Sequence, residues 1–470
     1  MSEFKEIDAL FRRQKANSYM LRAENAEKRK SRLKAIELWI ENHLNEINEA
    51  LFRDFKKPAE EVSISEVYPV LSEIRHAMRY LDEWMHPRKV KTPGSMMGTS
   101  ANILLEPKGV CLIISPWNYP FNLAIGPLVS ALAAGNAVML KPSEISSNTS
   151  ILIQEMISSI FPDDEVAVIT GGVEVGQYLT SLPFDHIFFT GSTAVGSSIM
   201  KSAAANLTSV TLELGGKSPA VVDRSADLPA AAEKIAWGKL LNNGQTCIAP
   251  DYALVCRDVY DDFISELIHK MEKLYGRGTG NFRASPDYAR IISSEHHKRL
   301  AGYIEHAEEA GARIIYGGDY DTEERFLNPT LMDRIPENDP LLTEEIFGPV
   351  LPIVPFDEID EVISFINRRP KPLAAYVFAR DERIYDLVCR DTSSGGICWN
   401  TCLIHFGHPN LPFGGVNHSG IGKSHGFYGF RAFSNERARL VEHTGIALKA
   451  ILPPYSKIVK NITEYLLKYF

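Results

Sequence analysis

The segment 109–223 constrains the fold most, because short apolar runs alternate in it with stretches of helical pattern. Apolar runs without polar alternation are typical of parallel strands that helices cover on both faces. The runs are 110–114, 137–140, 166–169, 187–189 and 210–214, and helices are expected to begin near Leu123, Asn148, Val173 and Ala194. The pattern predicts an α/β fold that binds its ligands at the carboxyl ends of the strands.

Helical spacing precedes this segment, and a second α/β pattern follows it. Apolar residues recur every three or four positions over 3–57, and a further helix is expected over 65–84. From 228 to 391 the pattern predicts long helices at 261–274 and 296–310 and strands at 313–316 and 350–354. Because 470 residues exceed what one hydrophobic core usually supports, two or three domains are expected.

Two segments are distinct from these patterns. Basic residues, a Pro-Gly turn and a tip of small residues predict a projecting hairpin at 87–105, which is a candidate oligomer contact. The tail 446–470 has two consecutive prolines and then apolar residues at helical spacing. We expect this tail helix to pack on the body or on a partner subunit. Association with a membrane surface is the less favoured alternative.

Charge and cysteine usage argue against several classes of protein. Fifty basic residues against 59 acidic ones give a net charge of −9, which argues against nucleic acid as a partner. The first residues lack the apolar core of a signal peptide, and no run approaches the length of a membrane span. Six cysteines in a chain of this length do not make a disulfide framework, so a cytoplasmic protein is expected.

Cys247 stands out because an irregular segment presents its thiol. It lies in the stretch NNGQTCIAP, residues 242–250, between a glycine turn and a proline, and this placement suits a nucleophile. A lone cysteine is more often a small buried hydrophobe. A catalytic role therefore needs partners elsewhere in the chain.

Unusual residues follow three of the predicted strands. They are Trp117 and Asn118 after the first run, Lys141 and Glu144 after the second, and Gly191, Ser192 and Gly196 in the turn TGSTAVG after the fourth. This turn opens a helix directly from a strand, so its free N–H groups could hold a phosphate. Thr193 replaces the middle glycine of the usual dinucleotide fingerprint, so a plain strand-to-helix turn stays open as an alternative.

Glu213 is a charged residue inside the apolar run that ends with Leu214. It could face solvent or form a salt bridge at a strand edge. If it is buried, desolvation raises its pKa into the range where a carboxylate acts as a base at neutral pH. Gly215 and Gly216 follow and would let the backbone approach a ligand closely.

Seven motifs together resemble the aldehyde dehydrogenase superfamily. In chain order they are SPWNYP, KPSE, FTGSTAVG, LELGGKSP, NNGQTCIAPDY, EEIFGPV and PFGGVNHSGIG. Their order and spacing are similar to those of the family over residues 3–445. The short N-terminus, the sequence CIAPDY and the ending HGFYGFRAFS resemble the class 3 and fatty aldehyde branch.

The resemblance implies a catalytic role for three residues. Cys247 is similar to the family's nucleophile, which attacks the aldehyde carbon to give a thiohemiacetal and then a thioester. Asn118 resembles the side-chain donor to the oxyanion. Glu213 resembles the general base that activates water for hydrolysis of the thioester.

The resemblance also implies a nicotinamide cofactor. Lys141 and Glu144 are similar to the pair that binds the adenosine ribose, and Ser192, with Gly191 and Gly196 in its turn and Trp117 nearby, resembles the pyrophosphate contact. Leu214, Glu345 and Phe347 resemble residues at the nicotinamide and its ribose. Glu144 should repel a 2′-phosphate, which favours NAD, although class 3 relatives with such a glutamate also accept NADP.

The implied fold is α/β, with a Rossmann-like cofactor domain, a catalytic α/β domain and a small bridging element. The cofactor domain would comprise 1–86, 106–211 and part of 396–426, and the catalytic domain 212–395. Segments 87–105 and 427–445 would form the bridging element, 446–470 the tail helix, and the family resemblance implies a homodimer. Tyr119, Phe121, Trp237 and Phe406 suggest an apolar aliphatic or aromatic aldehyde as the substrate.

Departures from the family pattern touch no catalytic role. Asn243 stands where many class 3 members have alanine, and Asn417-His418 varies the closing glycine-rich motif. Cys398, Cys402, His405 and His408 have the chemistry of metal ligands, but they are crowded into 11 residues without a second arm, so no metal is expected.

Two other functions remain as alternatives. A CoA-acylating semialdehyde dehydrogenase would use the same cysteine without a water-activating glutamate. A non-catalytic protein on the same scaffold would be expected to have lost some of these residues.

Overall fold

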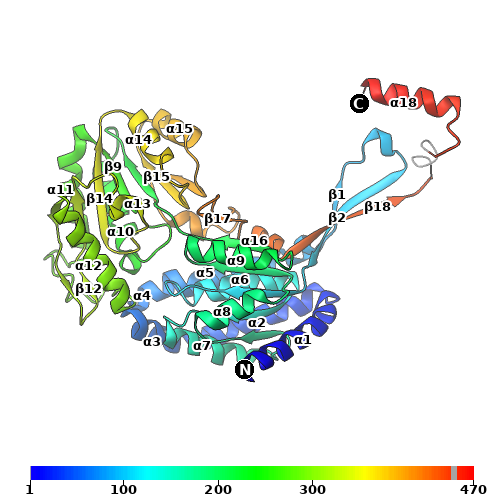
Figure 1. The fold of residues 1–470 in the computed structure, drawn as a ribbon, viewed down its shortest axis with the longest axis horizontal. Helices are drawn as coiled ribbons and strands as arrows, with labels where there is room; N and C mark the ends of the chain where they lie inside the picture. The colour runs from blue at the N-terminus through cyan, green and yellow to red at the C-terminus, as the bar shows by residue number, and fades with distance from the viewer. Residues whose placement is uncertain (1, 446–451, 470) are drawn as a thin grey trace.

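The computed structural model describes residues 2–445 and 452–469, which form two sheets with their helices and one narrow arm (Figure 1). The first sheet has six strands in the order β17-β7-β6-β3-β4-β5. Their bounds are β3 Val110–Ile114, β4 Ala137–Lys141, β5 Val166–Val168, β6 His186–Thr190, β7 Ser209–Glu213 and β17 Gly420–Ile421. Strands β3 to β7 are parallel and β17 is antiparallel to β7, so the predicted parallel sheet is confirmed.

Helices cover both faces of this sheet because alternate residues of each strand point to opposite sides. Val110 and Leu112 pack with α1 (Ser2–Arg22), α8 (Val173–Ser181) and α9 (Thr193–Ala204). Cys111 and Ile113 pack with helices on the other face. Those helices are α2 (Ala26–Asn42), α3 (Leu44–Phe55), α5 (Tyr68–Met85), α6 (Asn122–Ala134) and α7 (Ser147–Ile160).

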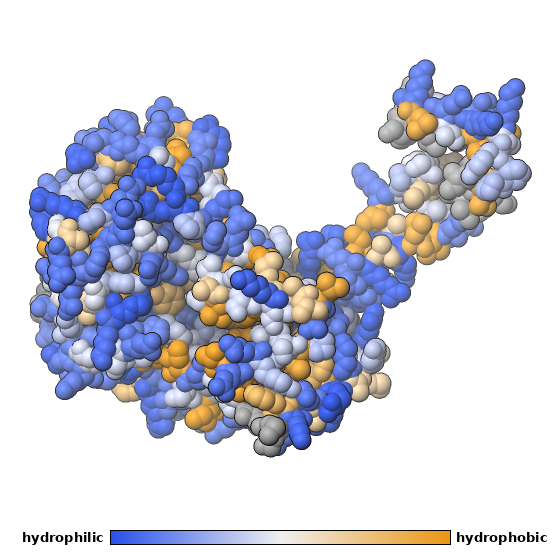
Figure 2. All heavy atoms as spheres, viewed as in Figure 1, coloured by the Kyte–Doolittle hydropathy of each residue, from blue (hydrophilic) through white to orange (hydrophobic). Residues whose placement is uncertain are grey.

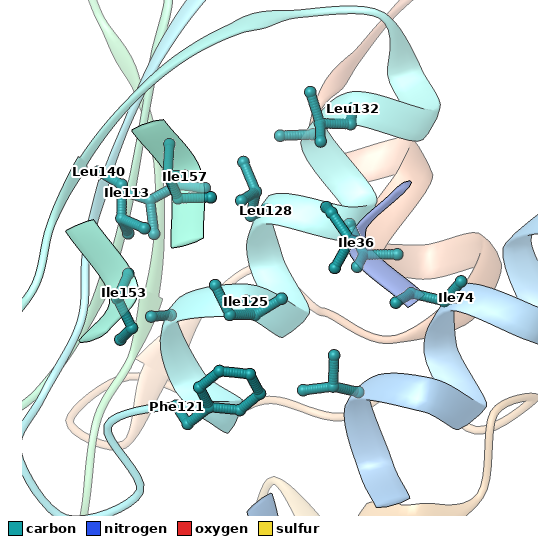
Figure 3. Close-up of a cluster of buried hydrophobic side chains, with 14 of the residues drawn as sticks. Ile36, Ile74, Ile113, Phe121, Ile125, Leu128, Leu132, Leu140, Ile153 and Ile157 are labelled. Carbon is teal, nitrogen blue, oxygen red and sulfur yellow. The ribbon is translucent and has the colours of Figure 1, made fainter. Parts of the chain in front are cut away.

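The core on that second face holds one residue that the sequence suggested for the substrate site. Phe121 is fully buried beside Ile125 of α6 and lies in the same cluster as Leu140 of β4 (Figure 3). Phe121 precedes the first turn of α6, which directs its ring to the core. The expectation that Phe121 lies near the substrate is therefore wrong.

The second sheet has seven strands in the order β10-β13-β14-β9-β8-β15-β16. Their bounds are β8 Pro219–Val222, β9 Tyr252–Cys256, β10 Arg313–Tyr316, β13 Thr330–Asp333, β14 Val350–Phe356, β15 Ala374–Phe378 and β16 Gly396–Trp399. All are parallel except β10. Helices α10 (Leu228–Leu240) and α11 (Tyr260–Tyr275) pack on one face, and α14 (Ile359–Asn367) and α15 (Glu382–Asp391) on the other.

Shorter elements complete the body. Helix α12 (Ser294–Glu309) and α13 (Pro340–Thr343) share a small core with β13 and β14. A hairpin joins β11 (Tyr320–Asp321) to β12 (Phe326–Leu327). Helix α4 (Ala59–Val62) continues through the π-helical turn η1 (Ser63–Val67) into α5. The segment 396–426 is shared between the sheets, because β16 joins the seven-stranded sheet and β17 the six-stranded one.

The arm is a three-stranded antiparallel sheet that projects from the body (Figure 1). Strand β1 (Arg88–Val90) pairs with β2 (Thr99–Pro107), and β2 pairs along its whole length with β18 (Ser434–Glu442). The sequence predicts that all of 427–445 belongs to the bridging element, but the residues before β18 are part of the body. They form helix α16 (Gly426–Ala432), which packs on α5 and α6 because Phe430 is buried in their core.

The tail helix α18 (Lys457–Tyr469) lies beyond the arm and away from the body (Figure 1). Its Ile458, Tyr465 and Leu467 are 71%, 59% and 82% exposed, so the expected packing on the body is not found in the described part of the tail. The expected start of the tail, 446–451, and Phe470 are outside the described residues. Within the described ranges, no helix is both long and apolar enough to cross a membrane.

Candidate active site

A cavity of about 300 Å³ brings the reactive candidates together. Cys247 and Glu213 both line it, although 34 residues separate them in the chain. Helices α5 and α6, the loop after α10, and the segment 403–425 form its walls. Tyr119, Trp237 and Phe406 also line the cavity, as their expected proximity to the substrate requires.

We call residues 242–250 the Cys247 loop, and its conformation is one that asparagine and glycine favour. It continues from the short helical turn η3 (Leu241–Gly244). Asn242 and Asn243 have φ values of 52° and 56°, in the left-handed region that asparagine tolerates better than alanine does. A Cβ at Gly244 would lie 2.3 Å from the Gly348 carbonyl oxygen. The side chain of Asn243 donates to Ala289 O at 2.7 Å, so this residue fixes the loop from behind.

Asn118 is hydrogen-bonded to the Cys247 loop through its side chain and through its backbone carbonyl. Its Nδ2 donates to Gln245 O at 3.1 Å, and Asn242 Nδ2 donates to Asn118 O at 2.7 Å. A side-chain amide carries two N–H donors, and the bond to Gln245 uses one of them. Asn118 is 3% exposed, so its remaining donor acts in a site largely shielded from water.

The environment of Cys247 favours the neutral thiol. Burial raises its pKa, and the carboxylates of Glu345 and Glu213 raise it further. The backbone N–H groups of Cys247 and Ile248 act in the opposite direction. Two carboxyl groups therefore raise the pKa of this thiol. Among the described residues that line the cavity, Cys247 is the one cysteine.

Glu213 is the last residue of β7 and is only 5% exposed. Its Oε1 accepts a hydrogen bond from Ser424 Oγ at 2.9 Å, and its Oε2 has no hydrogen-bond partner among the described residues. Burial raises the pKa of Glu213 to about 8, while the Ser424 hydroxyl and the Lys423 ammonium lower it. Of the two interpretations of Glu213, the structure supports the buried carboxyl.

The turn between β6 and α9 has the features of a phosphate site. Ser192 caps α9 by accepting from Val195 N, and Gly191 N donates to Glu213 O at 3.0 Å. A Cβ at Gly196 would lie 2.6 Å from Leu214, so glycine is needed for close packing of α9 on β7. Val195 N is used by the Ser192 cap, so Thr193 N and Ala194 N are the first-turn N–H groups left to bind an anion.

Lys141 and Glu144 lie at the end of the neighbouring strand β4. Lys141 Nζ is 3.0 Å from Glu144 Oε2, and the carboxylate remains 42% exposed. Lys141 itself is 4% exposed. This pair offers a charged donor and an acceptor side by side, as binding of two ribose hydroxyls requires.

Glu345 and Phe347 come from the loop before β14. A Cβ at Gly215 would lie 2.0 Å from Glu345 Oε2, so the glycine admits the carboxylate. Burial raises the pKa of Glu345 to about 8, and its Oε1 lacks a hydrogen-bond partner within the described part of the chain. The ring of Phe347 meets that of Trp117 edge to face at 5.3 Å. A buried acceptor without a partner in the described residues fits a ribose hydroxyl.

Sequence reasoning missed the buried ion pair that holds this loop. Lys217 Nζ donates to Asp251 at 2.7 Å and to the carbonyl oxygens of Leu341 and Glu344 at 2.8 and 2.9 Å. Asp251 also accepts from Ile346 N. Lys217 lies in the motif LELGGKSP and Asp251 in NNGQTCIAPDY, so their positions in these motifs were the available signal.

A second buried ion pair was also missed, and it supports Asn118. Lys57 Nζ lies 2.7 Å from Glu66 Oε1, and both side chains are fully buried. Glu66 Oε2 accepts from Asn122 N, while Lys57 Nζ reaches Asn118 O at 3.4 Å. The pair thus ties η1 and the segment before it to the turn that carries Asn118.

Replacing Lys57 with methionine is expected to cost about 3 to 5 kcal/mol of unfolding free energy, because Glu66 is left buried without a counter-charge. Urea unfolding measures this loss. The double variant Lys57→Met with Glu66→Leu should recover much of it. Arg53→Met, which breaks a surface pair with Glu49, should cost less than about 1 kcal/mol. Equal losses for Lys57→Met and Arg53→Met would contradict the structural role of the buried pair.

Cys402 and His405, two of the four residues with metal-ligand chemistry, contact different parts of the protein. Cys402 Sγ donates to Lys234 O, and the ring of His405 lies against Tyr376 and Phe413. No group of three or more ligating side chains gathers anywhere in the described residues.

Comparison with known proteins identifies the family. The model of the aldehyde dehydrogenase family matches residues 2–438. The 4,4'-diaponeurosporen-aldehyde dehydrogenase of Staphylococcus aureus is 41% identical over 437 residues, which cover 93% of this chain and 94% of that protein. Aldehyde dehydrogenase family 3 member A2 of Mus musculus is 42% identical over 414 residues, which cover 88% of this chain and 84% of that protein.

A solved structure shares the whole architecture. The structure described as the substrate bound state of Staphylococcus aureus AldH superimposes with a TM-score of 0.94 at 40% identity, and covers 98% of this chain and 99% of that chain. The chain belongs to the aldehyde dehydrogenase family, which confirms the resemblance read from the motifs. It is an NAD(P)-dependent oxidoreductase that converts an aldehyde to the acid.

Proposed function

We propose that Cys247, Asn118 and Glu213 carry out this oxidation. The observation that supports it most is that Cys247 shares one cavity with a buried carboxyl whose Oε2 is unpaired among the described residues. The thiol of Cys247 first loses its proton to water, and the resulting thiolate attacks the aldehyde carbon. The free N–H of the Asn118 amide and the backbone N–H of Cys247 donate to the oxygen as it becomes negative.

Glu213 acts in the second half of the reaction. When bound, NAD(P)⁺ supplies the acceptor for the hydride. Loss of that hydride leaves a thioester on Cys247, and Glu213 Oε2 removes a proton from the water that hydrolyses it. A CoA-acylating enzyme would not need this base, so the buried, unpaired carboxyl oxygen favours hydrolysis.

Three groups of residues hold the cofactor in this proposal. Lys141 and Glu144 bind the adenosine ribose, and the turn with Gly191, Ser192 and Gly196 binds the pyrophosphate beside Trp117. Glu345 binds the nicotinamide ribose, and Phe347 and Leu214 pack beside the ring. The 42% exposed carboxylate of Glu144 repels a 2′-phosphate, so NAD is preferred and NADP is used less well.

The cavity favours an apolar aliphatic or aromatic aldehyde. One wall consists of apolar and aromatic side chains, namely Trp237, Leu241, Ile248, Leu403, Phe406 and Phe413. Burial lowers the pKa of His425, which also lines the cavity, to about 4, so its ring is neutral at pH 7. Neither lysine nor arginine is among the described residues that line it. A substrate that carries a carboxylate would lose its hydration here without gaining a counter-charge.

An aldehyde panel tests this specificity. Reduction of NAD and of NADP is followed with a straight-chain aldehyde, an aromatic aldehyde and a semialdehyde of similar length with a free carboxylate. We expect kcat/KM for the first two to exceed that for the semialdehyde by roughly tenfold or more, with NAD preferred. A preference for the semialdehyde would contradict the proposed substrate class.

We also infer a cytoplasmic homodimer. Free cysteines throughout the described residues are consistent with a reducing compartment. Apolar residues gather along the arm (Figure 2). Among the apolar side chains of its strands, Val90, Leu440 and Val441 are at least 40% exposed. Their burial against a second copy would remove this surface from water. Sedimentation of the full chain and of a Leu440→Asp variant tests the inference, since only the first should be dimeric.

A further inference from the structure

The described residue that donates a hydrogen bond to the side chain of Glu213 is Ser424. Its hydroxyl is 2.9 Å from Oε1, and Ser424 is 6% exposed. The role proposed for Glu213 requires a carboxylate with one defined oxygen directed at water. A carboxylate on a strand end can rotate about its side-chain bonds unless something holds it. The contact with Ser424 therefore bears on the chemistry as well as on packing.

The backbone around Ser424 is fixed on both sides. Ser424 and Phe413 form an antiparallel bridge, in which Ser424 N donates to Phe413 O at 2.7 Å and Phe413 N donates to Ser424 O at 3.3 Å. Two residues further on, Gly426 N donates to the carboxylate of Glu73 at 2.9 Å. We call residues 413–426 the closing segment. The closing segment binds the carboxyl of Glu213 through the Ser424 side chain and that of Glu73 through the Gly426 backbone.

The closing segment is also joined directly to the strand that carries Glu213. Gly420 of β17 is the register partner of Glu213, and Leu214 N donates to Ser419 O at 3.1 Å. At Gly414, where φ is 144°, a Cβ would lie 3.1 Å from Glu213 Oε1 and 2.7 Å from Gly422 O. The segment thus approaches Oε1 from two directions, and Oε2 is left without a hydrogen-bond partner among the described residues.

We propose that Ser424 is a positioning residue for Glu213, whose hydroxyl holds Oε1 so that Oε2 is the oxygen that takes the proton from water. This inference rests on the role of Glu213 proposed above. Because Ser424 donates to the carboxylate, it also stabilises the charged form, which is the form that acts as a base. No earlier step of the reaction requires this contact.

Among the other titratable groups around Glu213, Lys423 acts on it through charge. Lys423 lies in the closing segment, donates to Gly415 O at 3.3 Å and lowers the pKa of Glu213. His425 and Glu73 line the same cavity from the closing segment and α5, and Cys247 does so from the Cys247 loop. None of these four residues donates a hydrogen bond to the Glu213 carboxylate in the described structure, so Ser424→Ala removes one specific contact.

The test compares Ser424→Ala, Ser424→Thr and Ser434→Ala in the full-length chain. Ser434 is an equally buried serine whose hydroxyl donates to Phe430 O, away from the cavity, so it controls for loss of a buried hydroxyl. Two quantities are measured across pH values that bracket 8. They are the amplitude of the first-turnover burst of reduced cofactor and the rate at which the acyl adduct on the protein is hydrolysed, followed by intact mass.

Ser424→Ala is expected to keep the burst amplitude and to shift the midpoint of the hydrolysis profile upward by about one pH unit, since a hydrogen bond to the charged form is lost. Ser424→Thr should restore the wild-type midpoint. An unchanged midpoint in Ser424→Ala, failure of threonine to restore it, or an equal shift in Ser434→Ala would overturn the proposal. If Glu213→Gln hydrolyses the acyl adduct at the wild-type rate, the role of Glu213 itself fails instead.

Discussion

Cys247→Ala is expected to lower aldehyde oxidation by roughly ten-thousand-fold or more, because no covalent intermediate can form without the sulfur. Cys247 is the cysteine that lines the cavity, so no described neighbour can substitute for it. The measurement is the rate of cofactor reduction with a saturating aldehyde. The small change in volume should leave cofactor affinity intact, which equilibrium titration with NAD can verify.

Cys389→Ala provides the matched control for this variant. Cys389 is exposed on α15, away from the cavity lining, so its replacement should leave the rate unchanged. Residual turnover within about tenfold of wild type in Cys247→Ala would refute the assignment of the nucleophile. Loss of NAD binding in the same variant would show that the cysteine has a structural role that is not expected from its contacts.

Glu213→Gln is expected to reduce steady-state turnover by roughly 100- to 10,000-fold while a single burst of reduced cofactor survives. Glutamine has the same shape and can still accept from Ser424, but it cannot take a proton from water. Stopped-flow absorbance separates the burst from the slow phase, and intact mass should then show the acyl adduct on Cys247. Steady turnover without accumulation of the adduct would exclude Glu213 as the base.

The same glutamate sets the expected pH dependence. Burial raises the pKa of Glu213 to about 8, above its ordinary range, so the carboxyl is mostly protonated at pH 7. The base is active only when ionised. The hydrolysis rate should therefore rise as pH increases through about 8 and level off above it. A hydrolysis rate independent of pH between 6 and 9 would argue against a carboxyl with this raised pKa.

Much of the architecture could be predicted because it follows from local pattern. The five apolar runs of 109–223 became β3 to β7 with ends that differ by at most one residue, since uninterrupted apolar runs are typical of strands between two helical layers. The four helix starts near Leu123, Asn148, Val173 and Ala194 likewise lie within one residue of α6 to α9. The prediction for 313–316 also matched β10.

Side-chain direction in the turns could not be predicted. Tyr119 and Phe121 are two residues apart in the same irregular segment, yet Tyr119 lines the cavity and Phe121 fills the core. An irregular turn has no period from which to assign a face. The helix α16 inside 427–445 was missed because its two glycines weaken the local helical signal, and packing on α5 and α6 compensates for them.

The sequence by itself determined the order of strands and helices in 109–223, the motifs with Cys247 and Glu213, and the family to which they belong. Only the tertiary structure decided how the two residues work. Burial of Glu213, its pKa of about 8 and its bond to Ser424 depend on atoms brought together from β7 and the closing segment, 211 residues apart. Local propensity is encoded in neighbouring residues, whereas desolvation and hydrogen bonding across the fold arise only after the chain has packed.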